Sequence, residues 1–186
     1  RSLSLLKMTL LDPVLSVLIT GVAMVLVINP FAAIINNGLN AWLNGMSGSS
    51  AVLLGAVLGG MMAIDMGGPV NKAAYVFGSG TLAATMTSGG SLPMAAVMAG
   101  GMVPPIAIAL ASSIFKNKFT AEEREAGLTN YIMGFSFITE GAIPYAAADP
   151  ARLIPASVIG SAITGALVGL FQIKIPAPHG GILVMA

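Results

Sequence analysis

Charged residues are scarce in this sequence. Asp, Glu, Lys and Arg make up 8% of its 186 residues, whereas they account for about 25% of an ordinary soluble domain. Three uncharged stretches together cover more than half of the chain: residues 13–64, 73–115 and 153–173. A water-facing surface cannot be built from the remainder. The composition therefore excludes a soluble globular domain and makes lipid the expected solvent for most of the chain.

Cysteine is absent, and there is one histidine. The lack of cysteine excludes disulfides, thiolate chemistry and cysteine-based metal sites, so any covalent sulfur intermediate would lie on another chain or domain. The histidine and the carboxylates show no metal-ligand spacing, and the P-loop, GxSxG and HExxH motifs are missing, so we expect no metal and no cofactor. A net charge of +1 without long basic runs argues against nucleic acid as a partner.

The two ends of the chain indicate a portion of a larger membrane protein. It begins at Arg1 rather than Met, and no signal-peptide pattern precedes the first apolar run. It stops within an apolar stretch, Gly180–Ala186. Since the sequence shows no internal repeat and no low-complexity linker, we expect a single domain over residues 1–186.

Two clean apolar runs predict transmembrane helices. Val14–Ile35 has 22 residues, which as a helix reach about 33 Å and cross the ~30 Å hydrocarbon layer. Asp12 and Pro13 before this run predict a helix start with Asp12 as the N-cap, and Pro30 predicts a kink or an end. The second run is Leu153–Ile173.

The run Leu153–Ile173 has small residues at every fourth position: Ser157, Ser161, Gly165 and Gly169. Small residues at this spacing let another helix approach closely, so this helix should pack inside a bundle. Before the run, Asp149 is expected to cap the helix, and Arg152 is expected to anchor it at the lipid headgroups.

Other apolar stretches are interrupted. Leu92–Phe115 is long enough to cross, but Gly-Gly at 100–101 and Pro-Pro at 104–105 predict a bend or break near its middle. Asn36–Ser50 carries an amphipathic period with Trp42 on the apolar face, which fits a short helix in the membrane interface. A plain loop with a chance apolar stripe is the alternative there.

Lys116–Glu125 is the one clearly hydrophilic segment, with six charged residues among ten. Thr120 followed by Glu123 predicts a capping box at the start of a helix. The three Lys and Arg residues of this segment favour a cytoplasmic loop.

Three short segments combine polar residues with helix breakers: Asp65–Lys72, Thr139–Pro144 and Pro176–Gly181. Irregular backbone within a membrane is tolerated only where it is buried in protein or lines a wet cavity. Transporters use such discontinuous helices to expose backbone groups to polar substrates. The sequence therefore predicts an all-α, polytopic membrane helical bundle with broken helices, and the functional residues are expected at these three breaks.

Glu140 is the sharpest candidate for a functional residue. Fourteen uncharged residues precede it and eight follow it, so we expect a deep position, where an ionisable group costs about 2.5–3.5 kcal/mol and by default marks a functional site. Its expected partners are a sugar hydroxyl, a proton or Lys72. The alternative is a structural salt bridge between broken helices.

Further residues at the breaks are candidates for ligand binding. Asn71 can both donate hydrogen bonds to and accept them from a hydroxyl-rich ligand. Lys72 can pair with Asp65 or Glu140 inside the protein, or extend to the lipid headgroups. His179 lies in a Pro-His-Gly-Gly sequence, which is not a helix-core setting, and is expected either in the ligand site or in a structural role.

Three motifs of the sequence resemble one known family. They are DMGGPVNKAA at residues 65–74, GFSFITEGAIPY at 134–145 with ADP at 148–150, and PAPHGG at 176–181. In this order they resemble the membrane component, enzyme IIC, of the fructose branch of the bacterial sugar phosphotransferase system. The similarity covers nearly the whole chain and corresponds to the C-terminal part of that component.

The resemblance implies a mechanism that composition cannot show. In that family the membrane component binds a hexose-type sugar outside and exposes it inside, where a phosphocysteine of the B component phosphorylates it. By this resemblance, Glu140 would hydrogen-bond the hydroxyl that accepts phosphate and help to remove its proton. His179 and Asn71 would hold the sugar ring, and Asp65 and Lys72 complete the expected substrate-binding set. The related structures are dimers with re-entrant hairpins beside the sugar.

The leading hypothesis is therefore a sugar-translocating permease, multi-pass in the bacterial cytoplasmic membrane, that forms the membrane part of a protein-phosphocysteine–sugar phosphotransferase. Its expected partners are the sugar, the phosphorylated B component, membrane lipid and a second copy of the chain. The alternative is an ion- or proton-coupled secondary transporter without phosphoryl transfer, and a channel or assembly subunit is a third possibility. Fructose, a fructose-like hexose or a mannosyl conjugate would each suit a polar pocket.

Overall fold

The computed structural model describes residues 7–46 and 50–184, and most of this length is helical. The part of the chain that it describes contains no strand, only an isolated β-bridge between Ser91 and Ile175. The predicted all-α fold is therefore confirmed. Contacts between residues divide the chain into two units, residues 1–39 and 40–186, and the single domain stays a prediction.

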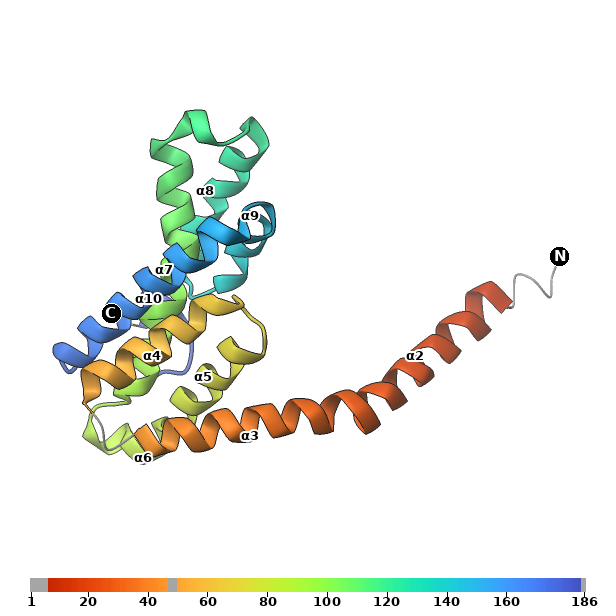
Figure 1. Cartoon of the computed structure of the whole chain (residues 1–186), viewed down its shortest axis with the longest axis horizontal. Helices are drawn as coiled ribbons and strands as arrows, with labels where there is room; N and C mark the ends of the chain where they lie inside the picture. The colour runs from red at the N-terminus through yellow and green to blue at the C-terminus, as the bar shows by residue number, and fades with distance from the viewer. Residues whose placement is uncertain (1–6, 47–49, 185–186) are drawn as a thin grey trace. The chain divides into compact units, whose positions relative to one another are not determined.

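The first unit consists of helical segments in direct succession: η1 (Lys7–Leu11), α2 (Asp12–Ala23), η2 (Met24–Ile28) and the start of α3 (Asn29–Met46) (Figure 1). Asp12 is not an N-cap, because the helical turn η1 precedes it and Leu11 occupies the N-cap position of α2. Pro30 does not end the helix. The wider π-helical turn η2 lies directly before Pro30. Its wider hydrogen-bond spacing accommodates a proline, which has no N–H to donate.

The predicted interfacial helix at Asn36–Ser50 is helical as far as Met46, so the alternative of a plain loop is wrong for this part. Trp42 is exposed. Residues 47–49 lie outside the described residues, and the position of this helix in a membrane interface stays a prediction.

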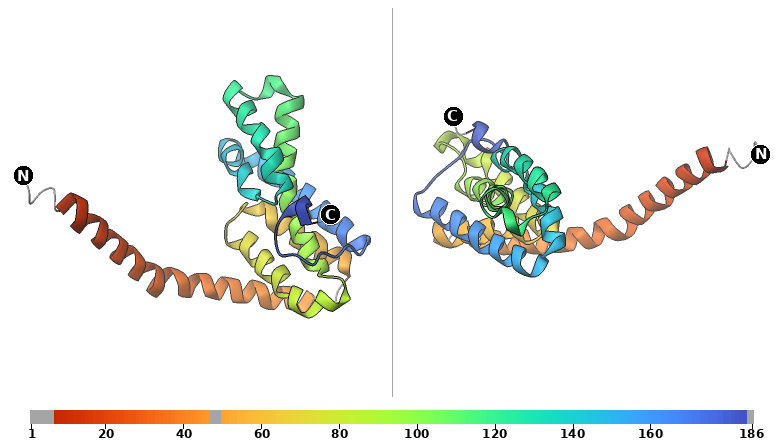
Figure 2. Two further views of the ribbon diagram at one scale, coloured as in Figure 1. Left: turned by 180° about the vertical axis from the view of Figure 1, so that it is seen from behind. Right: turned by 90° about the horizontal axis from the view of Figure 1, so that it is seen from above.

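The second unit contains, after the end of α3, the elements α4 (Ala51–Ile64), α5 (Pro69–Gly80), α6 (Leu82–Thr85), η3 (Met86–Ser88), α7 (Leu92–Ile114), η4 (Lys116–Lys118), α8 (Ala121–Phe135), η5 (Thr139–Ala142), α9 (Ile143–Ala148), α10 (Pro150–Leu170) and η6 (Gly181–Val184). Among the described helices, α7 and α10 are the two that are long and apolar enough to cross a membrane. Two views show α8 returning alongside α7, and α10 lying along α4 (Figures 1 and 2).

Helices α4 and α10 pack with their backbones close together. A Cβ atom on Gly165 of α10 would overlap the carbonyl oxygen of Gly55 on α4, and a Cβ atom on Gly59 would overlap that of Ser161. The four small residues of the predicted packing face are all buried: Ser157, Ser161, Gly165 and Gly169. The prediction that this face packs closely against another helix is confirmed.

Helix α7 runs without interruption through its two prolines, so of the predicted bend or break the break is wrong, and the bend stays a prediction. Pro104–Pro105 have no N–H, and the carbonyl groups of Gly100 and Gly101 therefore lack their ordinary helical donors. The hydroxyl of Ser161 on α10 donates to the Gly100 carbonyl at 2.8 Å. The hydroxyl of Thr139 on η5 donates to the Gly101 carbonyl at 2.9 Å. The two prolines thus turn two backbone carbonyls of α7 into docking points for other elements.

The predicted helix starts at Thr120 and Asp149 are confirmed. The Thr120 hydroxyl accepts from the Glu123 N–H at 3.2 Å, and the Glu123 carboxylate accepts from the Thr120 N–H at 2.7 Å, which completes a capping box. The Asp149 carboxylate accepts from the Arg152 N–H at 3.3 Å at the start of α10. Local polar groups therefore define where α8 and α10 begin.

We expect Gly165→Ala to destabilise the full-length protein, because the new Cβ atom would meet the backbone of α4, which cannot move aside as a flexible side chain can. Overpacking of this kind costs about 1–3 kcal/mol. The measurement is the midpoint of thermal unfolding in detergent. Gly80→Ala is the matched control, since nothing lies within 4 Å of a Cβ atom there; equal midpoints for the two variants would contradict the close packing of α4 and α10.

Candidate functional site

The segment between α4 and α5 forms a tight corner. Met66 adopts a positive φ of 47°, and Pro69 occupies the first position of α5. The Asp65 carboxylate accepts hydrogen bonds from the N–H groups of Val70 at 2.7 Å and Asn71 at 2.9 Å. Asp65 therefore satisfies N–H groups that the first turn of a helix leaves free.

Asn71 joins the two helices of this corner. Its side chain is 2% exposed, and its Nδ2 atom donates to the carbonyl of Met62, near the end of α4, at 2.8 Å. The Oδ1 atom and the second amide hydrogen can bond to other partners. Lys72 follows in the same capped turn, where its N–H donates to the Gly68 carbonyl at 2.9 Å.

The turn that carries Glu140 lies between α8 and α9. Phe137 in this turn has a positive φ of 64°, a strained conformation for a residue with a side chain, and it is 5% exposed. Its ring fills the space beside α7 that a Cβ atom on Gly101 would occupy, and Thr139 donates to the carbonyl of the same glycine. A ring contact and a hydrogen bond thus hold the turn against α7 just before Glu140.

Glu140 faces the corner between α4 and α5. Its Oε1 atom lies 3.3 Å from Nζ of Lys72, so the predicted pair is present. A Cβ atom on Gly67 would lie 2.9 Å from the same oxygen, and the missing side chain leaves room for the carboxylate. The side chain of Glu140 is 46% exposed. Glu140 therefore lies at the edge of a cavity rather than inside an apolar helix, and its depth in a membrane stays a prediction.

His179 lies in the third predicted break, after α10. Its ring centroid is 5.0 Å from that of Phe137, and its side chain is exposed. Two residues further on, a Cβ atom on Gly181 would overlap the carbonyl oxygen of Phe135. This close approach of two backbones brings the histidine to the turn that carries Glu140.

These three segments enclose a cavity of about 300 Å³. Eight residues line it: Met62, Asn71, Lys72, Tyr75, Phe137, Thr139, Glu140 and His179. The structure therefore brings together four of the five predicted site residues. Asp65 does not line this cavity, since both of its carboxylate oxygens are bonded to the backbone of α5.

Four lining residues were not among the five predicted site residues: Met62, Tyr75, Phe137 and Thr139, of which Thr139 lies within a predicted break. Tyr75 follows Asn71 by four positions on α5, so helical spacing alone places it on the same face. Phe137 and Thr139 belong to the motif that contains Glu140, so the motif itself was a signal for both residues. No pattern in the sequence marks Met62 as part of the site.

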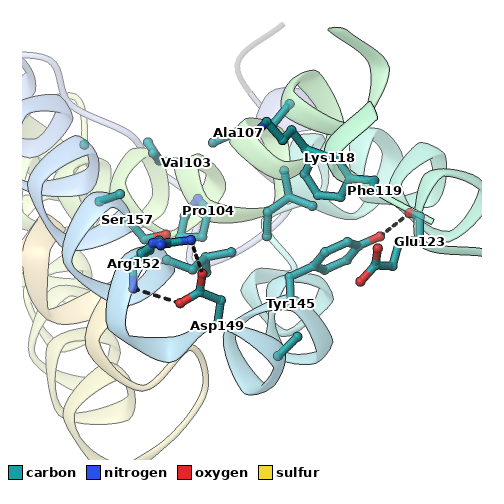
Figure 3. A pocket seen from close by; sticks show the side chains of 16 residues that line it. Val103, Pro104, Ala107, Lys118, Phe119, Glu123, Tyr145, Asp149, Arg152 and Ser157 are labelled. Atoms are coloured by element: carbon teal, nitrogen blue, oxygen red, sulfur yellow. Dashed lines mark hydrogen bonds and ion pairs between the residues drawn. The ribbon is translucent and has the colours of Figure 1, made fainter. Parts of the chain in front are cut away.

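A larger cavity, of about 540 Å³, lies between α7, α9 and α10 (Figure 3). Its walls are mostly apolar, and several of its polar side chains already have partners within the protein. The Arg152 guanidinium lies 3.4 Å from the Asp149 carboxylate, and the Tyr145 hydroxyl donates to the backbone carbonyl of Glu123 at 2.6 Å. The smaller cavity has a less apolar lining and brings a carboxylate, an ammonium group, an amide and an imidazole together, so it is the better candidate for binding a polar solute.

Comparison with known proteins finds relatives over the whole chain. The PTS system fructose-specific EIIABC component of Bacillus subtilis (strain 168) is 54% identical over 184 residues, which are 99% of this chain and 28% of that protein. The PTS system fructose-specific EIIB'BC component of Rhodobacter capsulatus is 55% identical over 186 residues, which are 100% of this chain and 32% of that protein. The fructose permease IIC component of Bacillus amyloliquefaciens is 54% identical over 184 residues, which are 99% of this chain and 59% of that protein.

The chain thus spans from 28% to 59% of the length of these three relatives, and it matches their C-terminal portions. No family model matches the chain. No solved structure matches it either. The similarity to these relatives includes all three segments that line the smaller cavity.

We expect Thr139→Val to destabilise the full-length protein by about 1–3 kcal/mol, because the substitution leaves the buried Gly101 carbonyl without a donor. Thr139→Ser keeps the hydroxyl and is the matched control. Pro105→Ala restores an N–H that can donate to the same carbonyl. Thr139→Val should therefore cost less when Pro105→Ala is also present.

The measurement is a double-mutant cycle of thermal unfolding midpoints in detergent. The wild type, the two single variants and the double variant are compared. Strictly additive effects would show that Thr139 does not replace the helical donor that proline removes.

Proposed function

We propose that this chain, which belongs to the family of fructose-specific C components of the phosphotransferase system, binds a sugar beside Glu140 and translocates it for phosphorylation during uptake. One observation carries this proposal. A single cavity collects a carboxylate, an ammonium group, an amide and an imidazole from three separate breaks in an apolar helical chain. The carboxylate, the amide and the imidazole can form hydrogen bonds with a hydroxyl-rich ligand.

The size and lining of the cavity suit a monosaccharide. Its volume of about 300 Å³ is at the lower end of the range for small-molecule pockets, which is about 300–1,000 Å³. The rings of Tyr75 and Phe137 have centroids 6.3 Å apart. Their aromatic faces carry a partial negative charge, which attracts the C–H groups of a sugar. The relatives are named fructose-specific, and we propose fructose or a fructose-like hexose as the substrate.

Glu140 is the proposed catalytic residue. Its carboxylate accepts a hydrogen bond from the sugar hydroxyl that receives phosphate, and takes the proton as that oxygen becomes a nucleophile. Asn71 and His179 hold the sugar ring by hydrogen bonds. Asp65 acts indirectly, because its cap on α5 fixes the positions of Asn71 and Lys72.

The proposed phosphoryl donor is a phosphocysteine on a B component. This chain has no cysteine of its own, and relatives named EIIABC and EIIB'BC join B and C components in one protein. We place the protein in the bacterial cytoplasmic membrane as a multi-pass homodimer surrounded by lipid, with α7 and α10 as two of its spans.

The product of uptake separates this proposal from an ion- or proton-coupled transporter. A phosphotransferase permease accumulates the sugar as its phosphate, and an uncoupler alone does not collapse the uptake. Accumulation of free sugar that is abolished by an uncoupler would favour the secondary transporter. The names of the relatives support the permease.

We expect Glu140→Gln in the full-length protein to reduce sugar phosphorylation by about 10²–10⁴-fold, the usual contribution of a general base, without loss of expression. The measurement is uptake of labelled sugar by cells, with the sugar phosphate quantified. Glu122→Gln is the matched control, since Glu122 is an exposed carboxylate in the first turn of α8. Wild-type uptake by Glu140→Gln would remove Glu140 from the mechanism.

A further inference from the structure

We propose that Lys72 is a second catalytic residue, whose ammonium group stabilises the negative charge of the phosphoryl group while it passes to the sugar. This inference rests on the proposed function and adds a role that sugar binding alone does not require. It starts from the ion pair between Lys72 and Glu140, which joins the first turn of α5 to η5 across the edge of the cavity.

Lys72 is well placed for this role. Its Nζ atom lies 3.3 Å from Oε1 of Glu140, and its side chain is 55% exposed. Because the ammonium group is not buried, it can move to a ligand without a change in burial. Of the eight residues that line the cavity, Lys72 is the one with an ammonium or guanidinium group. The cap that Asp65 forms on α5 fixes the backbone of this turn.

A structural role explains the pair poorly. Both side chains are about half exposed, and ion pairs between such groups contribute little to stability. Phosphoryl transfer, in contrast, requires positive charge near the equatorial oxygens of the transferred group, and proteins supply it with Lys, Arg or a metal ion. Lys72 supplies such a charge within reach of the carboxylate that is proposed to bind the acceptor hydroxyl.

The proton transfer to Glu140 and the release of Lys72 are one event in this mechanism. The S–P bond of the donor phosphocysteine breaks, and its electron pair stays on the sulfur of the B component. The sugar oxygen forms the new O–P bond, and its proton goes to the Glu140 carboxylate. Glu140 is then neutral and attracts the ammonium group less strongly. Lys72 can turn from the carboxylate to the phosphoryl oxygens at the moment when these need a positive charge.

The test uses the full-length protein in vesicles with its phosphorylated B component. Single-turnover transfer of phosphate to fructose gives the rate, and equilibrium binding of labelled fructose gives the affinity. We expect Lys72→Met to slow transfer by about 10²–10³-fold, the usual cost of removing one charge-stabilising donor, and to change the sugar Kd by less than about threefold. Lys72→Arg keeps the charge in a different geometry and should restore part of the rate.

Lys174→Met is the matched control. Lys174 is an exposed lysine outside the cavity, whose ammonium group donates to the Ser88 carbonyl at 3.2 Å, and its loss should leave both rate and affinity unchanged. Wild-type transfer by Lys72→Met would refute the role of Lys72, and so would a loss of affinity as large as the loss of rate. The proposed function itself fails separately, if the wild-type protein binds no fructose or passes it no phosphate.

Discussion

Two carbonyl groups of α7, those of Gly100 and Gly101, are the constraint on which the rest of this structure depends. Pro104–Pro105 remove their helical donors, and buried carbonyls left without partners are costly. Ser161 satisfies one of them and thereby fixes α10. Thr139 satisfies the other and thereby fixes the turn that leads to Glu140. Packing of the bundle and placement of the candidate site therefore depend on the same turn of one helix.

The polar site follows from how the three helix breaks attach to this frame. Asn71 ties α5 to the end of α4, and Gly181 brings the segment of His179 onto the backbone that follows α8. Each break leaves polar groups at the edge of the bundle, where they meet around one cavity. The result is a carboxylate and an ammonium group that are close together yet free to change partners, because both remain about half exposed.

The helix starts at Thr120 and Asp149 could be predicted from the sequence because each depends on neighbours within a few residues. The cap predicted at Asp12 is wrong because a helical turn precedes it. The packing face of α10 was also predictable, since a four-residue period is local. The wrong prediction of a break in α7 depends on distant contacts. The prolines of α7 indicate a break, but hydroxyl groups 38 and 61 residues away in the sequence satisfy the freed carbonyls, and the helix continues. The exposure of Glu140 at a cavity edge could not be predicted either, because the sequence gives the length of its apolar flanks and not the turn at which the chain reverses.

The proposed function is that of a sugar-binding permease in which the acceptor hydroxyl of the sugar meets Glu140. The most direct test is a structure of the full-length protein with fructose bound. We expect the sugar in the smaller cavity, with a hydroxyl within hydrogen-bond distance of the Glu140 carboxylate and the ring beside Tyr75 and His179. Fructose bound instead in the larger cavity, between Tyr145 and Arg152, would contradict this account.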